Sequence, residues 1–188
     1  MKLRQILKDI SISALCAELD MEIAEIYYDS RKVEKGGLFF VVKGFESDGH
    51  RYIAAAVERG AVCVVCQEPP DFEIPYVLVE DSRRALAICS RNFFGDPSSE
   101  MTMIGVTGTN GKTTSTYLIK HLLEVCLDAK VGLVGTNGNM IGSEFLPTEY
   151  TTPESYELQK LFAQMLESGC THIVMEVSSH SLALDRVE

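Results

Sequence analysis

The stretch MIGVTGTNGKTT, Met103 to Thr114, runs from a short apolar segment into a glycine-rich turn and a Lys-Thr-Thr. A phosphate-binding loop of the usual kind has a glycine, four free residues and then Gly-Lys-Ser/Thr. Counting back from Gly111 places Val106 where the first glycine would stand, so the loop is a shortened version. It follows an expected strand and opens an expected helix, which lets backbone amides of residues 108–114 face phosphate oxygens.

The residues after the loop glycine carry the chemistry of this element. Lys112 would reach the terminal phosphates of a nucleotide, and the Thr113 hydroxyl would lie on Mg²⁺. The alternative is a tight turn with an exposed lysine. The position between a buried strand and an amphipathic helix favours the phosphate loop.

A second candidate element is the strand THIVMEV, Thr171 to Val177, in which Glu176 follows an apolar run. The carboxyl ends of parallel strands face the ligand crevice of such a sheet, so Glu176 is expected near the phosphate loop. A buried carboxylate needs a partner. We expect a cation held jointly with nucleotide, and a structural ion pair is the alternative.

Two further stretches are weaker signals. EYTTPES places the hydroxyls of Thr151 and Thr152 at an expected helix start, either as an anion site or as a helix cap with Pro153 at the first helical position. DSRKVEKGGLFF places Asp29, Ser30 and Arg31 after a strand, and its spacing alone favours a polar turn.

The composition argues against two classes of binding partner. The 188 residues are 46% hydrophobic, with a formal net charge of −10 and a sequence pI near 4.9. A nucleic-acid surface normally needs clustered basic residues, so we expect no nucleic-acid partner. The apolar runs are of strand length, so we also expect no membrane partner.

Six cysteines occur, two of them as Cys63-Val64-Val65-Cys66. The pair has the spacing of half a metal knuckle, but no second C-x-x-C or paired histidine follows. AVCVVC is typical of a buried strand, and no signal-peptide pattern precedes it. We therefore expect free thiols packed as small hydrophobic groups in a reducing cytoplasm.

The alternation of strands and helices predicts an α/β protein with parallel β-α-β units in two blocks. The first block covers residues 1–95, and GDPSSE, residues 95–100, is a turn-rich connector before the second block at residues 101–188. The second block shows three clear strands and a hairpin-like stretch. Expected strands are 22–29, 37–43, 61–66, 76–80, 101–106, 130–135 and 171–177, and expected helices are 50–60, 82–94, 112–126 and 153–169.

Taken together, TGTNGKTT, DSR with GGLFF, TTP and MEVSSH resemble the Mur ligases. The similarity runs from Asp29 to Glu188. It is greatest to the members that add the third peptide residue to a peptidoglycan precursor. The resemblance implies a small N-terminal α/β domain, residues 1–95, that binds the UDP-muramoyl substrate. It also implies that residues 101–188 are the first part of a P-loop, Rossmann-like parallel-sheet ATPase domain.

The resemblance also implies roles for particular residues. Lys112 and Glu176 would be catalytic, and Thr113 and Glu176 would hold Mg²⁺. Two substitutions in the family pattern occur, since relatives often have Asn where Tyr150 stands and Gln near Leu184. ATP phosphates would be held by Gly108, Thr109, Asn110, Gly111, Lys112, Thr113 and Thr114, the UDP end by Tyr28, Ser30, Phe45, Glu46 and Ser47, and the muramoyl peptide by Thr151, Thr152, Ser178 and Arg186.

The implied reaction is a cytoplasmic, ATP-dependent amide ligation on UDP-N-acetylmuramoyl-L-Ala-D-Glu through an acyl phosphate, by a monomer. The third residue is diaminopimelate or lysine. We expect the 188 residues to be an inactive fragment that binds part of the substrates. The alternatives are a nucleotide-binding module alone, another Mur ligase, a folylpolyglutamate synthetase-like ligase and a P-loop kinase.

Overall fold

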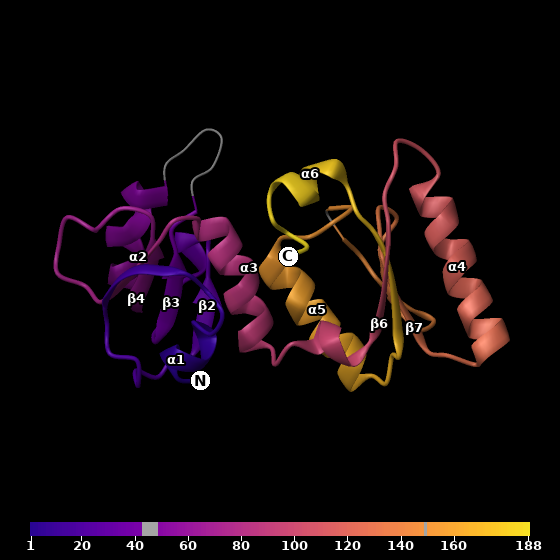
Figure 1. The fold of residues 1–188 in the computed structure, drawn as a ribbon, viewed down its shortest axis with the longest axis horizontal. Helices are drawn as coiled ribbons and strands as arrows, with labels where there is room; N and C mark the ends of the chain where they lie inside the picture. The colour runs from indigo at the N-terminus through magenta and orange to yellow at the C-terminus, as the bar shows by residue number, and fades with distance from the viewer. Residues whose placement is uncertain (43–48, 149) are drawn as a thin grey trace. The chain divides into compact units, whose positions relative to one another are not determined.

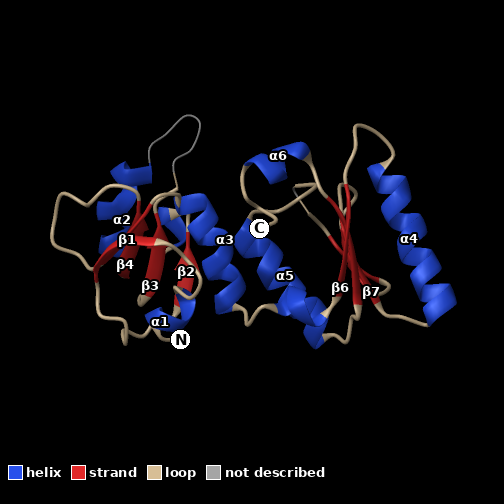
Figure 2. Cartoon of the chain, viewed as in Figure 1, coloured by secondary structure: helices blue, strands red, loops and turns tan. Residues whose placement is uncertain are grey.

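The computed structural model describes residues 1–42, 49–148 and 150–188. The chain divides into two compact units, Met1–Phe93 and Phe94–Glu188 (Figure 1). Each unit has its own five-stranded mixed sheet with helices against it (Figure 2). The α/β class expected from the sequence is confirmed. No helix within the described ranges is long and apolar enough to cross a membrane.

The first unit is built on a sheet with the strand order β1-β5-β4-β3-β2. Strands β2 to β5 are mutually parallel, and β1 pairs antiparallel with β5. Its strands are β1 (Ile12–Cys16), β2 (Glu25–Tyr27), β3 (Gly37–Phe40), β4 (Ala61–Cys66) and β5 (Tyr76–Val79), and its helices are α1 (Leu3–Ile6), α2 (Ile53–Arg59) and α3 (Ser82–Phe93), with 3-10 turns η1 (Ser30–Lys32) and η2 (Gly49–Tyr52). The four expected strands and two expected helices are present, whereas α1 and β1 had not been predicted.

Strand β4 runs through the core of this unit. Cys63 and Cys66 are fully buried within it, and the thiols are free. The expectation of cysteines packed as small hydrophobic groups is confirmed at these two positions. The cluster around β4 consists of Val33, Phe39, Val41, Ile53, Ala56, Ala61, Val64 and Cys66.

The sheet of the second unit has the order β6-β10-β7-β8-β9. Its first three strands are parallel, and β8 and β9 continue the sheet antiparallel from β7. The expectation of only three clear strands is therefore an underestimate, because the hairpin-like stretch supplies two more. The strands are β6 (Thr102–Val106), β7 (Val131–Val134), β8 (Asn139–Ile141), β9 (Glu144–Leu146) and β10 (His172–Glu176).

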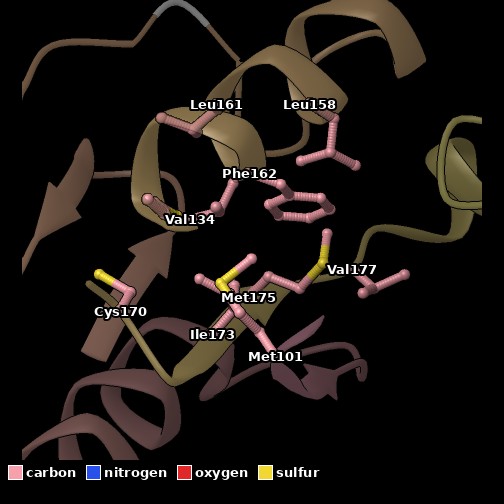
Figure 3. Packing of buried hydrophobic residues seen from close by; sticks show 10 residues of the cluster. Met101, Val134, Leu158, Leu161, Phe162, Cys170, Ile173, Met175 and Val177 are labelled. Atoms are coloured by element: carbon pink, nitrogen blue, oxygen red, sulfur yellow. The ribbon is translucent and has the colours of Figure 1, made fainter. Parts of the chain in front are cut away.

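Helices cover both faces of this second sheet. Helix α4 (Lys112–Leu127) lies on one face and α5 (Ser155–Glu167) on the other (Figure 1). Figure 3 shows the ring of Phe162 directed from α5 toward the strand residues. The short elements η3 (Pro97–Glu100) and α6 (Ser179–Ala183) complete the unit. The core consists of Met101, Val134, Leu158, Leu161, Phe162, Met165, Cys170, Ile173, Met175 and Val177.

The start of α5 differs from the prediction. The N-cap is Glu154, and the helix begins at Ser155 rather than at Pro153. The Thr152 hydroxyl does not cap the helix, because it donates to the carbonyl oxygen of Glu176 at 2.9 Å. The end of the helix agrees with expectation, since Gly169 follows the C-cap Ser168 and donates its N–H to Leu166.

Candidate functional site

The glycine-rich loop joins the end of β6 at Val106 to the first residue of α4. Gly108 has φ +150° and Gly111 has φ +77°, a backbone region that side chains with a Cβ rarely adopt. Gly111 is the N-cap of α4 and has no side chain to accept from the helix. The first amides of a helix have no partner within it, so in α4 they remain available to an anionic ligand.

Lys112 lies across this loop. Its ammonium donates to the carbonyl oxygen of Gly108 at 2.8 Å. The lysine is therefore held at the loop by this backbone contact, close to the amides of the helix start. This placement agrees with the predicted approach of Lys112 to phosphate, which stays a prediction.

Glu176 is buried at the end of β10, with 1% of its surface exposed. Its Oε1 accepts from the Thr136 N–H at 2.9 Å. Its Oε2 accepts from the hydroxyls of Thr113 at 3.0 Å and Thr136 at 3.2 Å. The ion pairs within the described ranges do not include Glu176, so a structural ion pair does not account for its burial there.

The contact between Thr113 and Glu176 joins the start of α4, after the glycine-rich loop, to the neighbouring strand β10, as the parallel-strand argument predicted. Both side chains offer oxygen ligands of the kind Mg²⁺ prefers. Among the described residues no group of three or more His, Cys, Asp or Glu side chains could hold a metal. Mg²⁺ at nucleotide sites is usually bound by one or two carboxylates together with phosphate oxygens and water, so this donor set fits.

Gly135 makes room for the carboxylate. A Cβ at this position would lie 2.5 Å from the Glu176 Oε1, which is closer than real Cβ contacts come. Thr136 comes next in the chain and supplies two of the three hydrogen bonds described for the carboxylate. Our prediction of the site from sequence missed Thr136. The signal that could have found it is its position just beyond the carboxyl end of the parallel strand β7, since the carboxyl end of a parallel strand also pointed to Glu176.

The four residues predicted to contact the muramoyl peptide lie near this strand end. Thr152 accepts from the Ser178 N–H at 3.4 Å, and its carbonyl accepts from Arg186 Nη1 at 3.2 Å. Arg186 also pairs with Glu154. The Thr151 hydroxyl oxygen lies 3.1 Å from that of Thr136. Their geometry is compatible with one binding surface, and their roles stay predictions.

The Asp29-Ser30-Arg31 segment in the first unit forms a local polar turn. Asp29 accepts from the backbone N–H of Arg31 at 3.0 Å and from its guanidinium at 2.9 and 2.8 Å. Hydrogen bonds from Arg31 lower the pKa of the Asp29 carboxyl. Ser30 begins η1 directly after this capping residue. Of the other predicted UDP contacts, Tyr28 precedes the turn, and Phe45, Glu46 and Ser47 lie outside the described residues.

Comparison with known proteins adds to this geometry. Residues 22–110 match the family described as Mur ligase family, catalytic domain, and residues 106–188 match the Mur ligase middle domain. Together the two matches run from Glu22 to the last residue. The chain belongs to the Mur ligase family. The resemblance inferred from the loop and from MEVSSH is confirmed.

Curated relatives within the Mur ligase family match the chain over its whole length. The chain is 50% identical over 190 residues to UDP-N-acetylmuramoyl-L-alanyl-D-glutamate--2,6-diaminopimelate ligase 1 of Clostridium acetobutylicum. It is 45% identical over 192 residues to the diaminopimelate ligase of Clostridium tetani. In both comparisons it covers 100% of its own length and 39% of the relative.

Solved Mur ligases share the fold. A UDP-N-acetylmuramoyl-L-alanyl-D-glutamate--2,6-diaminopimelate ligase superposes with a TM-score of 0.81 at 26% identity, over 100% of this chain and 38% of that one. The MurF ligase of Thermotoga maritima, in complex with ADP, superposes with a TM-score of 0.54 at 26% identity, over 85% of this chain and 33% of that one.

Proposed function

We propose that these residues bind ATP and the UDP-muramoyl substrate in a ligase that adds diaminopimelate to UDP-N-acetylmuramoyl-L-Ala-D-Glu. The observation that carries the reaction class is the contact of Thr113, on a shortened phosphate loop, with the buried Glu176. The names of the relatives favour diaminopimelate over lysine as the third residue. A nucleotide-linked precursor of this kind is consistent with a cytoplasmic protein, and we expect it to act as a monomer.

In this proposal the loop holds ATP through its amides. The N–H groups at the start of α4 donate to phosphate oxygens, and Lys112 leaves Gly108 to place its positive charge on the terminal phosphates. Thr113 and Glu176 would hold Mg²⁺, which supplies charge neutralisation of the phosphates when it is bound. The residues therefore fix ATP and stabilise the charge that develops on the transferring phosphoryl group.

The substrate side uses the surface beside Glu176. Thr151, Thr152, Ser178 and Arg186 would orient the muramoyl peptide so that its terminal carboxylate faces the γ-phosphate. That carboxylate attacks the phosphorus, which gives an acyl phosphate and releases ADP. The amine of diaminopimelate then attacks the acyl carbon, loses a proton and displaces phosphate, so that the amide bond forms. Such positioning is the main source of catalysis in phosphoryl transfer.

The first test is ATP binding by a Lys112→Ala variant. We expect calorimetric titration with ATP and Mg²⁺ to show saturable binding by the wild-type chain and none by the variant. The thermal unfolding midpoint should stay the same, because the Lys112 ammonium makes only an exposed contact with Gly108. Lys160→Ala removes an exposed lysine of α5 and serves as the matched control. Equal affinity of wild type and Lys112→Ala would contradict the nucleotide assignment.

The second test concerns the substrate class. The 188-residue chain should bind UDP-N-acetylmuramoyl-L-Ala-D-Glu and should not bind a folate, which would be the ligand of a folylpolyglutamate synthetase-like ligase. The gene product that contains these residues should release phosphate only when ATP, this substrate and diaminopimelate are all present. Release supported equally by lysine would overturn the choice of the third residue.

A further inference from the structure

Thr136 lies between Glu176, whose carboxylate is predicted to bind Mg²⁺, and Thr151, which is predicted to contact the substrate. It follows Gly135 at the carboxyl end of β7, 40 residues from Glu176 in the sequence. Its N–H donates to Oε1 of Glu176 at 2.9 Å, and its hydroxyl lies 3.2 Å from Oε2. The same hydroxyl oxygen is 3.1 Å from the hydroxyl of Thr151. One residue therefore contacts both oxygens of the carboxylate.

Hydrogen bonds to both oxygens determine the orientation of the Glu176 carboxylate. A carboxylate held at one oxygen can rotate about its last bond, because such terminal torsions are broad. Donors on both oxygens remove that freedom, and hydrogen bonds to an ionised acceptor are stronger than neutral ones. Glu176 is 1% exposed, so bulk solvent has little access to the carboxylate. Thr136 therefore fixes the plane in which the Glu176 oxygens lie.

The contribution of Thr136 to holding the carboxylate would become larger with a cation bound. Thr113 also donates to Oε2, at 3.0 Å. If Thr113 and Glu176 both turn lone pairs toward one cation, the hydrogen bond between them is given up. The two contacts from Thr136 then hold the carboxylate without help from the loop.

We propose that Thr136 is a positioning residue that orients the Glu176 carboxylate for Mg²⁺ in the ATP complex. This inference rests on the proposed function. It adds a residue from the turn after β7 to a site that the sequence predicted only from the loop and β10. Gly135 belongs to the same arrangement, because the absence of a Cβ there lets the carboxylate reach the Thr136 N–H.

The experiment measures the Mg²⁺ concentration that gives half-maximal binding of ATP to the 188-residue chain. Thr136→Val keeps the shape and the N–H but removes the hydroxyl, and we expect it to need about tenfold more Mg²⁺, the size expected from losing one hydrogen bond to a charged group. Thr136→Ser restores the hydroxyl and should lie within about twofold of wild type. Thr171→Val is the matched control, since Thr171 is exposed and directly precedes β10, at the end of the strand opposite to Glu176.

The affinity for ATP in EDTA separates positioning from a general structural role. Thr136→Val should bind metal-free ATP as wild type does, because the loop amides and Lys112 are unchanged. Equal Mg²⁺ dependence in wild type and Thr136→Val would overturn the inference, and so would a Thr136→Ser variant as impaired as Thr136→Val. A loss of ATP affinity in EDTA equal to the loss in Mg²⁺ would overturn it too. A wild-type chain that binds no ATP with Mg²⁺ would instead refute the proposed function itself.

Discussion

Glu176 shows how a single carboxyl side chain is accommodated in the interior of the second unit. Its oxygens accept from an N–H and two hydroxyls of Thr113 and Thr136, all of them uncharged donors. Burying a carboxylate costs several kcal/mol unless hydrogen bonds or an opposite charge compensate, and here hydrogen bonds alone do so within the described part of the chain. A cation that arrives with a nucleotide would add the missing opposite charge.

A Glu176→Gln substitution tests this interpretation at the residue scale. Glutamine has the same shape, its amide oxygen can accept from the Thr136 N–H, and its NH₂ can donate to the hydroxyl oxygens. We expect the unfolding midpoint to change by only a few degrees, while the Mg²⁺ needed for ATP binding rises at least about tenfold. Glu167→Gln, at an exposed position of α5, is the control. An unchanged Mg²⁺ requirement in Glu176→Gln would exclude this carboxylate as a metal ligand.

At the scale of elements, the sequence predicted those strands and helices whose bounds are set by local sequence patterns. The strand before the loop, the helix after it and the strand ending in Glu176 were all expected within one or two residues of their observed bounds, because apolar runs and glycine turns mark them. Strands β8 and β9 have three residues each, and they join the sheet through the pairing of β8 with β7 and of β9 with β8. The hairpin was therefore visible as a turn-rich stretch, but its place in the sheet was not.

In the candidate site, too, some contacts could be predicted from the sequence and others could not. Thr113 and Glu176 could be brought together from sequence, because the ends of parallel strands meet at one edge of a sheet. The cap assigned to Thr152 was wrong because its hydroxyl bonds to Glu176, 24 residues away, instead of to its own helix. Thr136 was missed for a related reason, since nothing in the local sequence GTNG shows that both its N–H and its hydroxyl meet a carboxylate.

Strand β4 gives a prediction about thiol chemistry. Burial raises the pKa of the Cys63 thiol to about 12 and that of Cys66 to about 11. The thiolate is the reactive form, so these groups react only as the pH rises toward those values or as the chain unfolds. At pH 8 we expect a thiol reagent to label the exposed Cys16 and Cys126 in the native chain. Mass spectrometry should find the other thiols labelled only in denaturant, and rapid native labelling of Cys63 or Cys66 would contradict a buried β4.

At the scale of the whole molecule, each unit has its own sheet and its own hydrophobic core. The predicted UDP contacts belong to Met1–Phe93, and the predicted ATP contacts belong to Phe94–Glu188. Because the two cores share no strands, each unit can hold its own predicted nucleotide contacts without residues from the other. The two nucleotides should therefore bind at separate places on one chain.

NMR titration of the 188-residue chain tests this separation. UDP should shift the amide signals of residues 28–30, because hydroxyl and backbone groups there can hydrogen-bond a uracil or a diphosphate. ATP with Mg²⁺ should shift those of residues 108–114. Inorganic pyrophosphate is the control that separates recognition of the diphosphate from recognition of the base. UDP shifts confined to residues 108–114 would show that the first unit is not the uridine site.

The contact of Lys112 with the Gly108 carbonyl has a kinetic consequence. The ammonium is already at the loop, and within the described residues its 2.8 Å hydrogen bond to Gly108 is the one that must break before it can turn to a phosphate. Exposed side chains change rotamer within nanoseconds, which is far faster than diffusional encounter with micromolar nucleotide. Capture of the nucleotide should thus appear in stopped-flow traces as a single phase whose rate rises linearly with ATP concentration, with no slower rearrangement of the loop behind it.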